Sequence, residues 1–329
     1  MAWSFRKRIK IIPGVHLNLS KNGLSTSIGD IFSADIHKIT SQGMQGIKEA
    51  IILARQQKKE LEQDLMSIQT ALMTARLKLM LSYIFLYGLI IKSISDNLKA
   101  DIAKQTEAVK QINEEIEDCY VSLNMDIEPG IKEKYDQLAN SFNKLMNSYR
   151  IWDVTSAHFQ DRVIARSSAS TIVDKQEVKF SFRSLPELRS DFKALYFQNA
   201  NGADLYCYPC FIVLYSTESA VEIIGIDEIN LQQSAVRFTE TGAVPPDSKI
   251  IDTTWAKVNK NGTPDKRFND NYQIPIVQYG ELRLSAKNGL NEEYEFSNYE
   301  STKEFSSIFK EYQMIIRRSN IADMSSATL

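Results

Sequence analysis

Cysteine and histidine are the residues most able to hold a metal or act as nucleophiles, and the chain has three of each. Cys207 and Cys210 form a C-x-x-C pair, a spacing found in redox and zinc sites. A zinc site needs two further ligands, yet there is no second such pair, and the histidines lie far upstream, at His16, His37 and His158. The pair falls within an apolar segment, Asp204–Tyr215, that we expect to be one strand. We therefore predict small buried thiols, with no metal and no cofactor.

Hydrolytic and nucleotide chemistry has little support in the sequence. The motifs G-x-S-x-G, H-E-x-x-H and G-x-x-x-x-G-K are all missing. His158 is the best-placed general base, but its surroundings, Ser156–Arg162, favour a helix between domains. We expect a protein without catalytic residues, and an enzyme of unfamiliar type in the C-terminal region is the least favoured of three hypotheses.

A polar loop after Val258, with the sequence NKNGTPDKRFNDN, combines turn-forming residues with charged ones. One interpretation is an internal ion pair that holds the loop on its domain, with Phe268 and the preceding tryptophan as hydrophobic anchors. The other is a rim loop whose two cations bind an anion or a peptide. The candidate binding residues are Trp255, Asp265, Lys266 and Arg267.

A second candidate surface is the basic face formed by Arg6, Arg8 and Lys10. Each such cation contributes about 1 kcal/mol to binding near an anionic membrane. The alternative is a solvated strand face that protects a sheet edge. The net charge of -2 gives no general attraction to nucleic acid, which we do not expect as a partner.

The basic face belongs to a short β segment that we place in residues 1–40. Alternation of apolar and polar residues predicts strands over 5–11, 15–20 and 24–28. Lys21-Asn22-Gly23 supplies the positive φ angles of a tight hairpin turn. The expected unit is a small β-meander.

This segment resembles the bacterial domain of unknown function 4236 over residues 3–29. The similarity is carried by Phe5–Lys10, Pro13–Val15, Asn18–Gly23 and Ser25–Gly29. The resemblance implies a bacterial protein, and a role in envelope maintenance or anti-phage defence is the expectation that goes with it. It implies no activity.

Residues 41–127 form the expected stalk, because apolar residues recur there in alternating steps of four and three. One such run contains Ile47, Ile51, Ala54, Leu61, Leu65, Ile68, Leu72, Ala75 and Leu79, with Lys58 as a charged intrusion. The second contains Leu98, Ile102, Val109, Ile112, Ile116, Cys119 and Leu123, with Gln105 as a polar one. The two runs are out of phase, so we predict a helical coiled-coil hairpin with an interruption.

That interruption is the apolar segment 77–94. Between Lys78 and Lys92 a helix spans about 20 Å, less than the roughly 30 Å hydrocarbon core of a membrane. Ser93 and Asp96 resemble a capping box, which favours a helix end near Lys92 and an apolar hairpin tip. A membrane segment stretched by snorkelling lysines is the alternative.

A helical connector is expected over 128–170, with an amphipathic helix at Ile131–Tyr149. A β-rich domain follows over 171–318 and is closed by a helix, Tyr299–Arg318, before a frayed tail, 319–329. The expected strands are Val178–Arg183, Ala194–Phe197, Asp204–Tyr215, Ala220–Ile226, Ala235–Thr239, Ile250–Val258, Ile274–Ser285 and Glu293–Phe296. This layout resembles a pleckstrin-homology-like antiparallel β-barrel or sandwich capped by a C-terminal helix, so the fold class is α+β.

Composition is that of a folded chain, with 43% hydrophobic residues in 329. The low cysteine count and the missing apolar leader in the first thirty residues predict a cytoplasmic protein. The first hypothesis is a non-enzymatic scaffold that forms a homo-oligomer through its coiled coil and binds a protein or ligand partner through its β domain. The second is an inner-membrane-associated protein inserted through 77–94.

Overall fold

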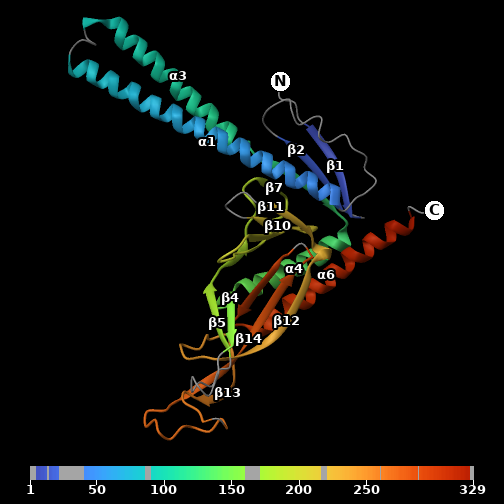
Figure 1. Cartoon of the computed structure of the whole chain (residues 1–329). Helices are drawn as coiled ribbons and strands as arrows, with labels where there is room; N and C mark the ends of the chain where they lie inside the picture. The colour runs from blue at the N-terminus through green and yellow to red at the C-terminus, as the bar shows by residue number, and fades with distance from the viewer. Residues whose placement is uncertain are drawn as a thin grey trace. The chain divides into compact units, whose positions relative to one another are not determined.

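The computed structural model describes residues 5–12, 15–21, 41–85, 90–159, 171–215, 221–259, 261–287 and 289–326 (Figure 1). The chain divides into two compact units. The first comprises Met1–Ile9, Leu17–Asn124 and Leu185–Asp191, and the second comprises Lys10–His16, Met125–Ser184 and Phe192–Leu329. The fold is mixed α+β, as the sequence predicts.

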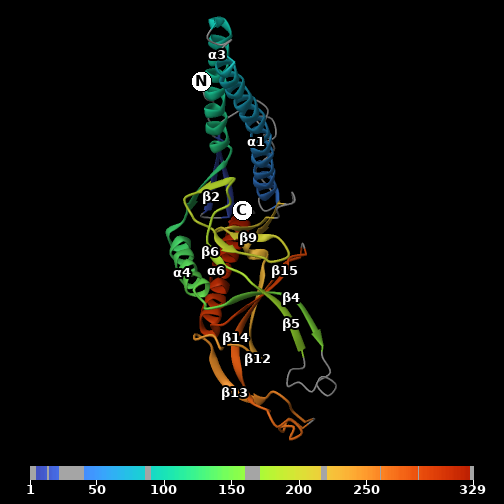
Figure 2. The same cartoon turned by 90° about the vertical axis from the view of Figure 1, so that its left-hand side faces the viewer.

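The first unit is dominated by a helical hairpin. Helix α1 runs from Ser41 to Ile84, and α3 runs from Lys92 to Glu117. The two helices lie side by side in both views (Figure 1, Figure 2). Ser93 does not cap α3, because the helix begins one residue earlier and its N-cap position, Ile91, makes no side-chain hydrogen bond. The predicted helix end near Lys92 is confirmed, and the predicted capping box is wrong.

The least exposed residues of the hairpin follow the four-three rhythm of the sequence. In α1, Ile47, Ile51, Ala54, Leu72 and Ala75 are buried, whereas Leu61, Leu65, Ile68 and Leu79 are only partly buried. In α3, every member of the second run from Leu98 to Ile116 is partly buried. Gln105 also lies in this row, and its side-chain oxygen is buried without a hydrogen-bond partner. The hairpin therefore leaves much of its apolar row half open to solvent.

The predicted stalk is too long at its C-terminal end. Strand β3, Val121–Ile127, follows α3, and it pairs in parallel with β7, Leu188–Ser190. Burial of Val121, Leu123 and Met125 shows the period of two that defines a strand. The helical rhythm obscured this signal, because Leu123 fits both patterns.

Strands β1, Phe5–Ile12, and β2, Val15–Lys21, extend this sheet in the order β1-β2-β3-β7. The first two predicted strands of the meander are thus confirmed. The Asn22-Gly23 turn and the strand expected over 24–28 lie outside the described residues.

The second unit contains a five-stranded antiparallel sheet ordered β11-β10-β9-β8-β6. Its strands are β6 Phe180–Phe182, β8 Leu195–Phe197, β9 Asp204–Cys207, β10 Phe211–Tyr215 and β11 Val221–Gly225. The single strand predicted over Asp204–Tyr215 is wrong. Pro209 lacks the N–H that a continuous strand requires, and the chain turns back between Cys207 and Phe211, where the Tyr208 amide donates to the Phe211 carbonyl at 2.8 Å.

A longer sheet, ordered β12-β14-β15-β4-β5, carries β13 paired to β14. Its strands are β4 Ile151–Phe159, β5 Thr171–Glu177, β12 Asn230–Thr239, β13 Lys249–Trp255, β14 Gln273–Ser285 and β15 Asn291–Phe296. Neither sheet closes into a barrel among the described strands, so the barrel alternative is not found. The prediction of a helical connector is wrong at β4, because His158 lies in this strand and not in a helix between domains.

Two helices pack on these sheets. Helix α4, Pro129–Met146, and α6, Tyr299–Ser326, lie side by side, and a short 3-10 turn, Ile226–Glu228, contacts α6. Helix α6 extends to Ser326, beyond the predicted helix end at Arg318, and the flexible tail expected over 319–329 stays a prediction. Gly280 of β14 permits the close approach of α6, since a Cβ there would lie 2.3 Å from Thr302 Oγ1.

Candidate functional site

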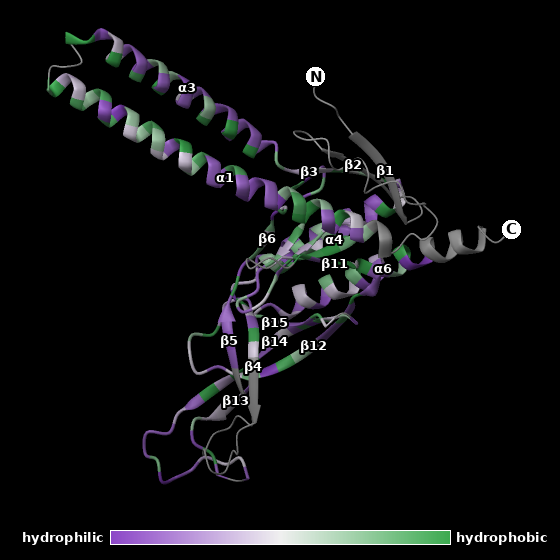
Figure 3. Ribbon diagram, turned by 45° about the horizontal axis from the view of Figure 1, so that its top comes forward, coloured by the Kyte–Doolittle hydropathy of each residue, from purple (hydrophilic) through white to green (hydrophobic). Residues whose placement is uncertain are grey.

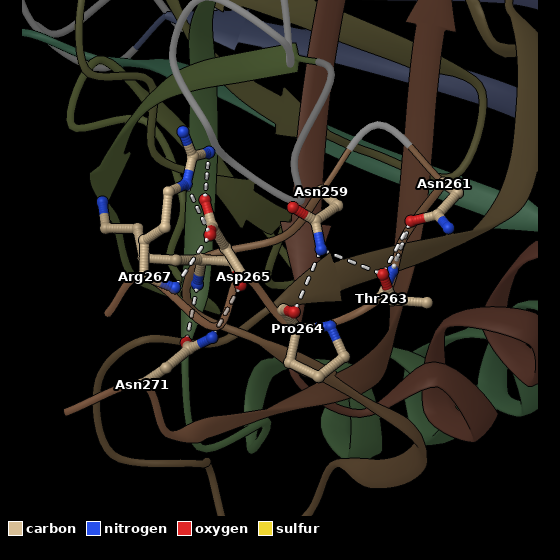
Figure 4. Close-up of polar contacts among 8 residues, drawn as sticks. Asn259, Asn261, Thr263, Pro264, Asp265, Arg267 and Asn271 are labelled. Carbon is tan, nitrogen blue, oxygen red and sulfur yellow. Dashed lines mark hydrogen bonds and ion pairs between the residues drawn. The ribbon is translucent and has the colours of Figure 1, made fainter. Parts of the chain in front are cut away.

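An ion pair between Asp265 and Arg267 holds the loop between β13 and β14 together (Figure 4). The guanidinium Nε donates to Asp265 Oδ1 at 2.9 Å and Nη2 donates to Oδ2 at 2.6 Å. The Asp265 carboxylate is buried, whereas 68% of the Arg267 side chain is exposed. The predicted internal ion pair is confirmed. Hydrogen bonding to Asp265 raises the pKa of the Arg267 guanidinium.

Asparagine side chains order the rest of this loop (Figure 4). Asn259 Nδ2 donates to Thr263 Oγ1 and to the Pro264 carbonyl, both at 3.0 Å. Asn271 pairs with the backbone of Lys257 through Oδ1 at 2.9 Å and Nδ2 at 2.8 Å. The loop is therefore built by its own contacts, without need of a ligand.

The remaining predicted residues of the loop are less constrained. Trp255 ends β13 and is half-buried, as is Phe268, which fits their predicted role as anchors. Lys266 is exposed. The structure thus joins Asp265 to Arg267, and binding of an anion or peptide by Lys266 and Arg267 stays a prediction.

The basic residues Arg6, Arg8 and Lys10 lie in β1, where a strand was predicted. Their side chains are outside the described part of the structure. Cys207 and Cys210 are buried free thiols, as predicted. Burial raises the pKa of Cys207 to about 12 and raises the pKa of Cys210 as well. Neither thiol therefore ionises readily to the reactive thiolate near neutral pH.

The six-stranded sheet holds a cluster that the sequence analysis did not identify. Lys175 of β5 directs its Nζ to Glu295 Oε2 of β15 at 2.9 Å. The same nitrogen lies 3.8 Å from the ring centroid of Phe238, 4.1 Å from that of Trp152 and 5.1 Å from that of Tyr279. These five residues come from five strands, and the first and last of them, Trp152 and Glu295, are 143 positions apart in the sequence. No short motif joins them, so only the fold brings them together.

The position of Lys175 shows how strongly this sheet curves. In a flat sheet β5 and β12 would lie about 19 Å apart, since four strand spacings separate them. Yet the Lys175 ammonium of β5 contacts the Phe238 ring of β12. The concave face is therefore bridged by side chains rather than by backbone pairing. Tyr279 is held in place on this face by its hydroxyl, which donates to Glu240 Oε2 at 2.6 Å.

A group of carboxylates surrounds Asn199 elsewhere in this unit. Asn199 Nδ2 donates to Glu292 Oε2 at 2.6 Å, and its backbone amide donates to Asp204 Oδ1 at 2.9 Å. Asp153 accepts from the Ala200 amide at 2.9 Å. Burial raises the pKa of both Asp153 and Glu292. These contacts shape the turn before β9 and give each acid a backbone or amide donor.

The tip of the helical hairpin exposes large apolar side chains. Phe85 is 69% exposed and Ile90 is 80% exposed, and Ile84, Ile91 and Ile94 are exposed beside them. Hydropathy colouring marks both helices as hydrophobic at the ends next to their connection (Figure 3). The predicted apolar tip is confirmed over the described residues. Among these residues, no helix combines the length and the apolar character needed to cross a membrane.

A second apolar row runs along the outside of α1 towards this tip. Its members are Met66, Met73, Leu77, Met80 and Ile84, each between 55% and 73% exposed. They occupy the b and f positions of the heptad in which Leu65 and Ile68 are a and d, so they face away from the hairpin's own seam. We call these five residues the outer stripe.

Comparison with known proteins identifies only the N-terminal segment. Residues 3–36 match the model of a family described as a protein of unknown function, DUF4236, which confirms the resemblance of this segment. The chain has no match among curated proteins or solved structures.

Proposed function

We propose that this chain is a non-enzymatic assembly protein whose helical hairpin binds a second copy of itself and whose β domain binds a protein or ligand partner. The observation that carries the proposal is the outer stripe. In a self-sufficient hairpin the b and f positions are polar, because they face water. They are polar in the first half of α1, at Gln45, Glu49, Gln56, Lys59 and Gln63, with Ile52 as the exception.

The spacing of the outer stripe favours another helix as its partner. From Met66 to Ile84 the stripe covers about 27 Å of helix, which is between two and three heptads. Its four-three steps match the knobs-into-holes packing of a coiled coil.

The test replaces Leu77 and Met80 together with glutamate and measures molecular mass in solution by light scattering. We expect the unmodified chain to have a multiple of the 37.5 kDa chain mass. The variant is expected to fall to the mass of one chain, with unchanged helicity by circular dichroism, because charges on exposed positions disturb association and not the hairpin.

The matched control replaces Gln63 and Gln69 with glutamate, which adds the same charge at exposed polar positions of the same helix. This control should retain the mass of the unmodified chain. A single-chain mass for the unmodified protein at concentrations of tens of micromolar would contradict the assembly role.

A second candidate function, attachment to an anionic membrane, is favoured by the hairpin tip. Phe85, Ile90 and Ile91 are exposed there, and exposed lysines, Lys78 and Lys92, flank them. Apolar side chains beside lysines suit shallow insertion at the level of the lipid headgroups. A component of the bacterial envelope or of anti-phage defence is the corresponding setting.

Sedimentation with phosphatidylglycerol-containing vesicles separates the two candidates. Membrane attachment through the tip predicts co-sedimentation that persists in high salt and is lost in a Phe85→Glu, Ile91→Glu variant. Binding that high salt abolishes would instead indicate the basic residues Arg6, Arg8 and Lys10. Assembly alone predicts that the protein stays in the supernatant.

A further inference from the structure

The ammonium group of Lys175 is enclosed by the chemical groups that proteins use to recognise organic cations. Three aromatic rings lie within 5.1 Å of Nζ, inside the range of about 6 Å for a cation–π contact. The Glu295 carboxylate adds a charge-assisted hydrogen bond at 2.9 Å. We call Trp152, Phe238, Tyr279 and Glu295 the cage.

The cage is a preformed and largely buried cluster, and not a contact between surface residues. Trp152, Tyr279 and Glu295 are buried, and Trp152 and Tyr279 pack on each other with ring centroids 5.1 Å apart. Phe238 stacks on Tyr279 with ring centroids 5.5 Å apart. Glu240 fixes the Tyr279 hydroxyl. The walls are therefore held by contacts that do not involve Lys175.

Lys175 lies on an edge strand beside an irregularity in its pairing. It lies on β5, an edge strand that pairs only with β4 among the described strands. The β4–β5 pairing is irregular between Val154 and Ser156, and Val154 is the residue opposite Lys175. Edge strands beside such irregularities open at lower free energy than central strands.

We propose that the cage is a binding site for an alkylammonium group, such as a lysine side chain or a methylated amine of a partner, and that Lys175 is its resident occupant. An incoming ligand displaces the Lys175 ammonium when the end of β5 moves aside. The proposal specifies the ligand class of the β domain and so rests on that half of the proposed function. It is independent of the outer stripe, whose variants leave the cage intact.

The test uses the full chain with Lys175→Ala and n-propylammonium chloride, which replaces the atoms that the substitution removes. We expect a saturable rise in melting temperature for this variant and none with n-propanol, the neutral analogue, at matched ionic strength. Tetramethylammonium should also bind, because a cation–π cage does not require N–H donors. The unmodified chain should need at least about tenfold more ligand, since Lys175 competes for the site.

Two variants serve as controls. Lys179→Ala removes a nearby exposed lysine with the same change of charge and should respond like the unmodified chain. Adding Glu295→Gln to Lys175→Ala should weaken n-propylammonium binding at least about tenfold, because the carboxylate supplies the ionic contact. If Lys175→Ala does not fold, Lys175→Met keeps the apolar stem, and tetramethylammonium binding is then followed through the Trp152 indole signal in nuclear magnetic resonance.

Three results would overturn the proposal. These are no saturable binding in either Lys175 variant, equal stabilisation by n-propanol, or equal affinity in the unmodified chain and the Lys175 variants. Each would leave Lys175 and Glu295 as a structural ion pair that holds the curved sheet. None of them changes the mass of the assembly, so failure of the cage and failure of the assembly role are distinguishable.

Discussion

In the second unit many of the largest apolar side chains are completely enclosed, whereas in the helical hairpin several large apolar side chains remain exposed to water. Phe142 of α4 contacts the rings of Phe180, Phe182, Phe197 and Phe305, and none of its surface is exposed. In the hairpin, Met73 is 73% exposed. The β domain completes its core within one chain, and the hairpin does not.

The difference follows from geometry. Sheets covered by α4 and α6 enclose side chains from several directions, so buried aromatic residues meet other residues on all sides. Two helices bury only the strip along which they touch. An apolar row outside that strip has to be covered by something else or remain in water.

The largest expected effect tests the closed core. Phe142→Ala should cost about 3–5 kcal/mol of unfolding free energy, because it leaves a cavity between four aromatic rings. Leu65→Ala in the half-open seam should cost only about 1–2 kcal/mol. Denaturant titration measures both losses, and equal losses would break the comparison.

A second substitution tests how closely the β domain is packed. Gly280→Ala should destabilise it by about 1–3 kcal/mol, since the added methyl group meets the Thr302 side chain. Gly130→Ala is the matched control, because an added Cβ there has nothing within 4 Å. Differential scanning calorimetry should show a lower melting temperature for the first variant alone.

A third prediction concerns the β13–β14 loop, which is exposed but internally ordered. Arg267→Ala removes the guanidinium that pairs with the buried Asp265 carboxylate and should make local opening of the loop easier. Hydrogen exchange over residues 256–272 should then speed up. Lys266→Ala, at an exposed neighbour, should leave exchange unchanged. The opposite order of effects would favour Lys266 as the structural cation.

The smallest effect concerns pH. The folded pKa of Asp153 is raised above its ordinary 3.8, so this acid favours the folded state below that value and opposes it as the pH rises through the folded pKa. Asp153→Asn should therefore gain stability relative to the unmodified chain as the pH rises from 3 to 7. If the difference in stability between Asp153→Asn and the unmodified chain did not change with pH, the raised pKa of Asp153 would be contradicted.

Much of the architecture could be predicted from local patterns. β14 was expected at Ile274–Ser285 and is found at Gln273–Ser285, because its alternation is long and its ends carry turn signals. Strand β4 was missed because Ile151–Phe159 follows an amphipathic helix directly and mixes polar residues with apolar ones. In the same way β3 was assigned to the stalk.

The two candidate sites differ in the same way, because one joins residues close together in the sequence and the other joins residues far apart. The Asp265–Arg267 pair is separated by two residues and was predictable from the loop alone. Lys175 and Glu295 are separated by 120 residues, and they meet only because β5 and β15 flank β4 in a curved sheet. Pairing order of this kind leaves no periodic trace in a sequence.

The burial of two thiols has a practical consequence for spectroscopy. Cys207 and Cys210 are closed to reagents in the folded protein, so Cys119, partly exposed just after α3, is the thiol that a maleimide spin label should modify first. A label at this position reports from the base of the hairpin. Electron–electron distances between the labels of two associated chains would reveal whether their hairpins run parallel or antiparallel.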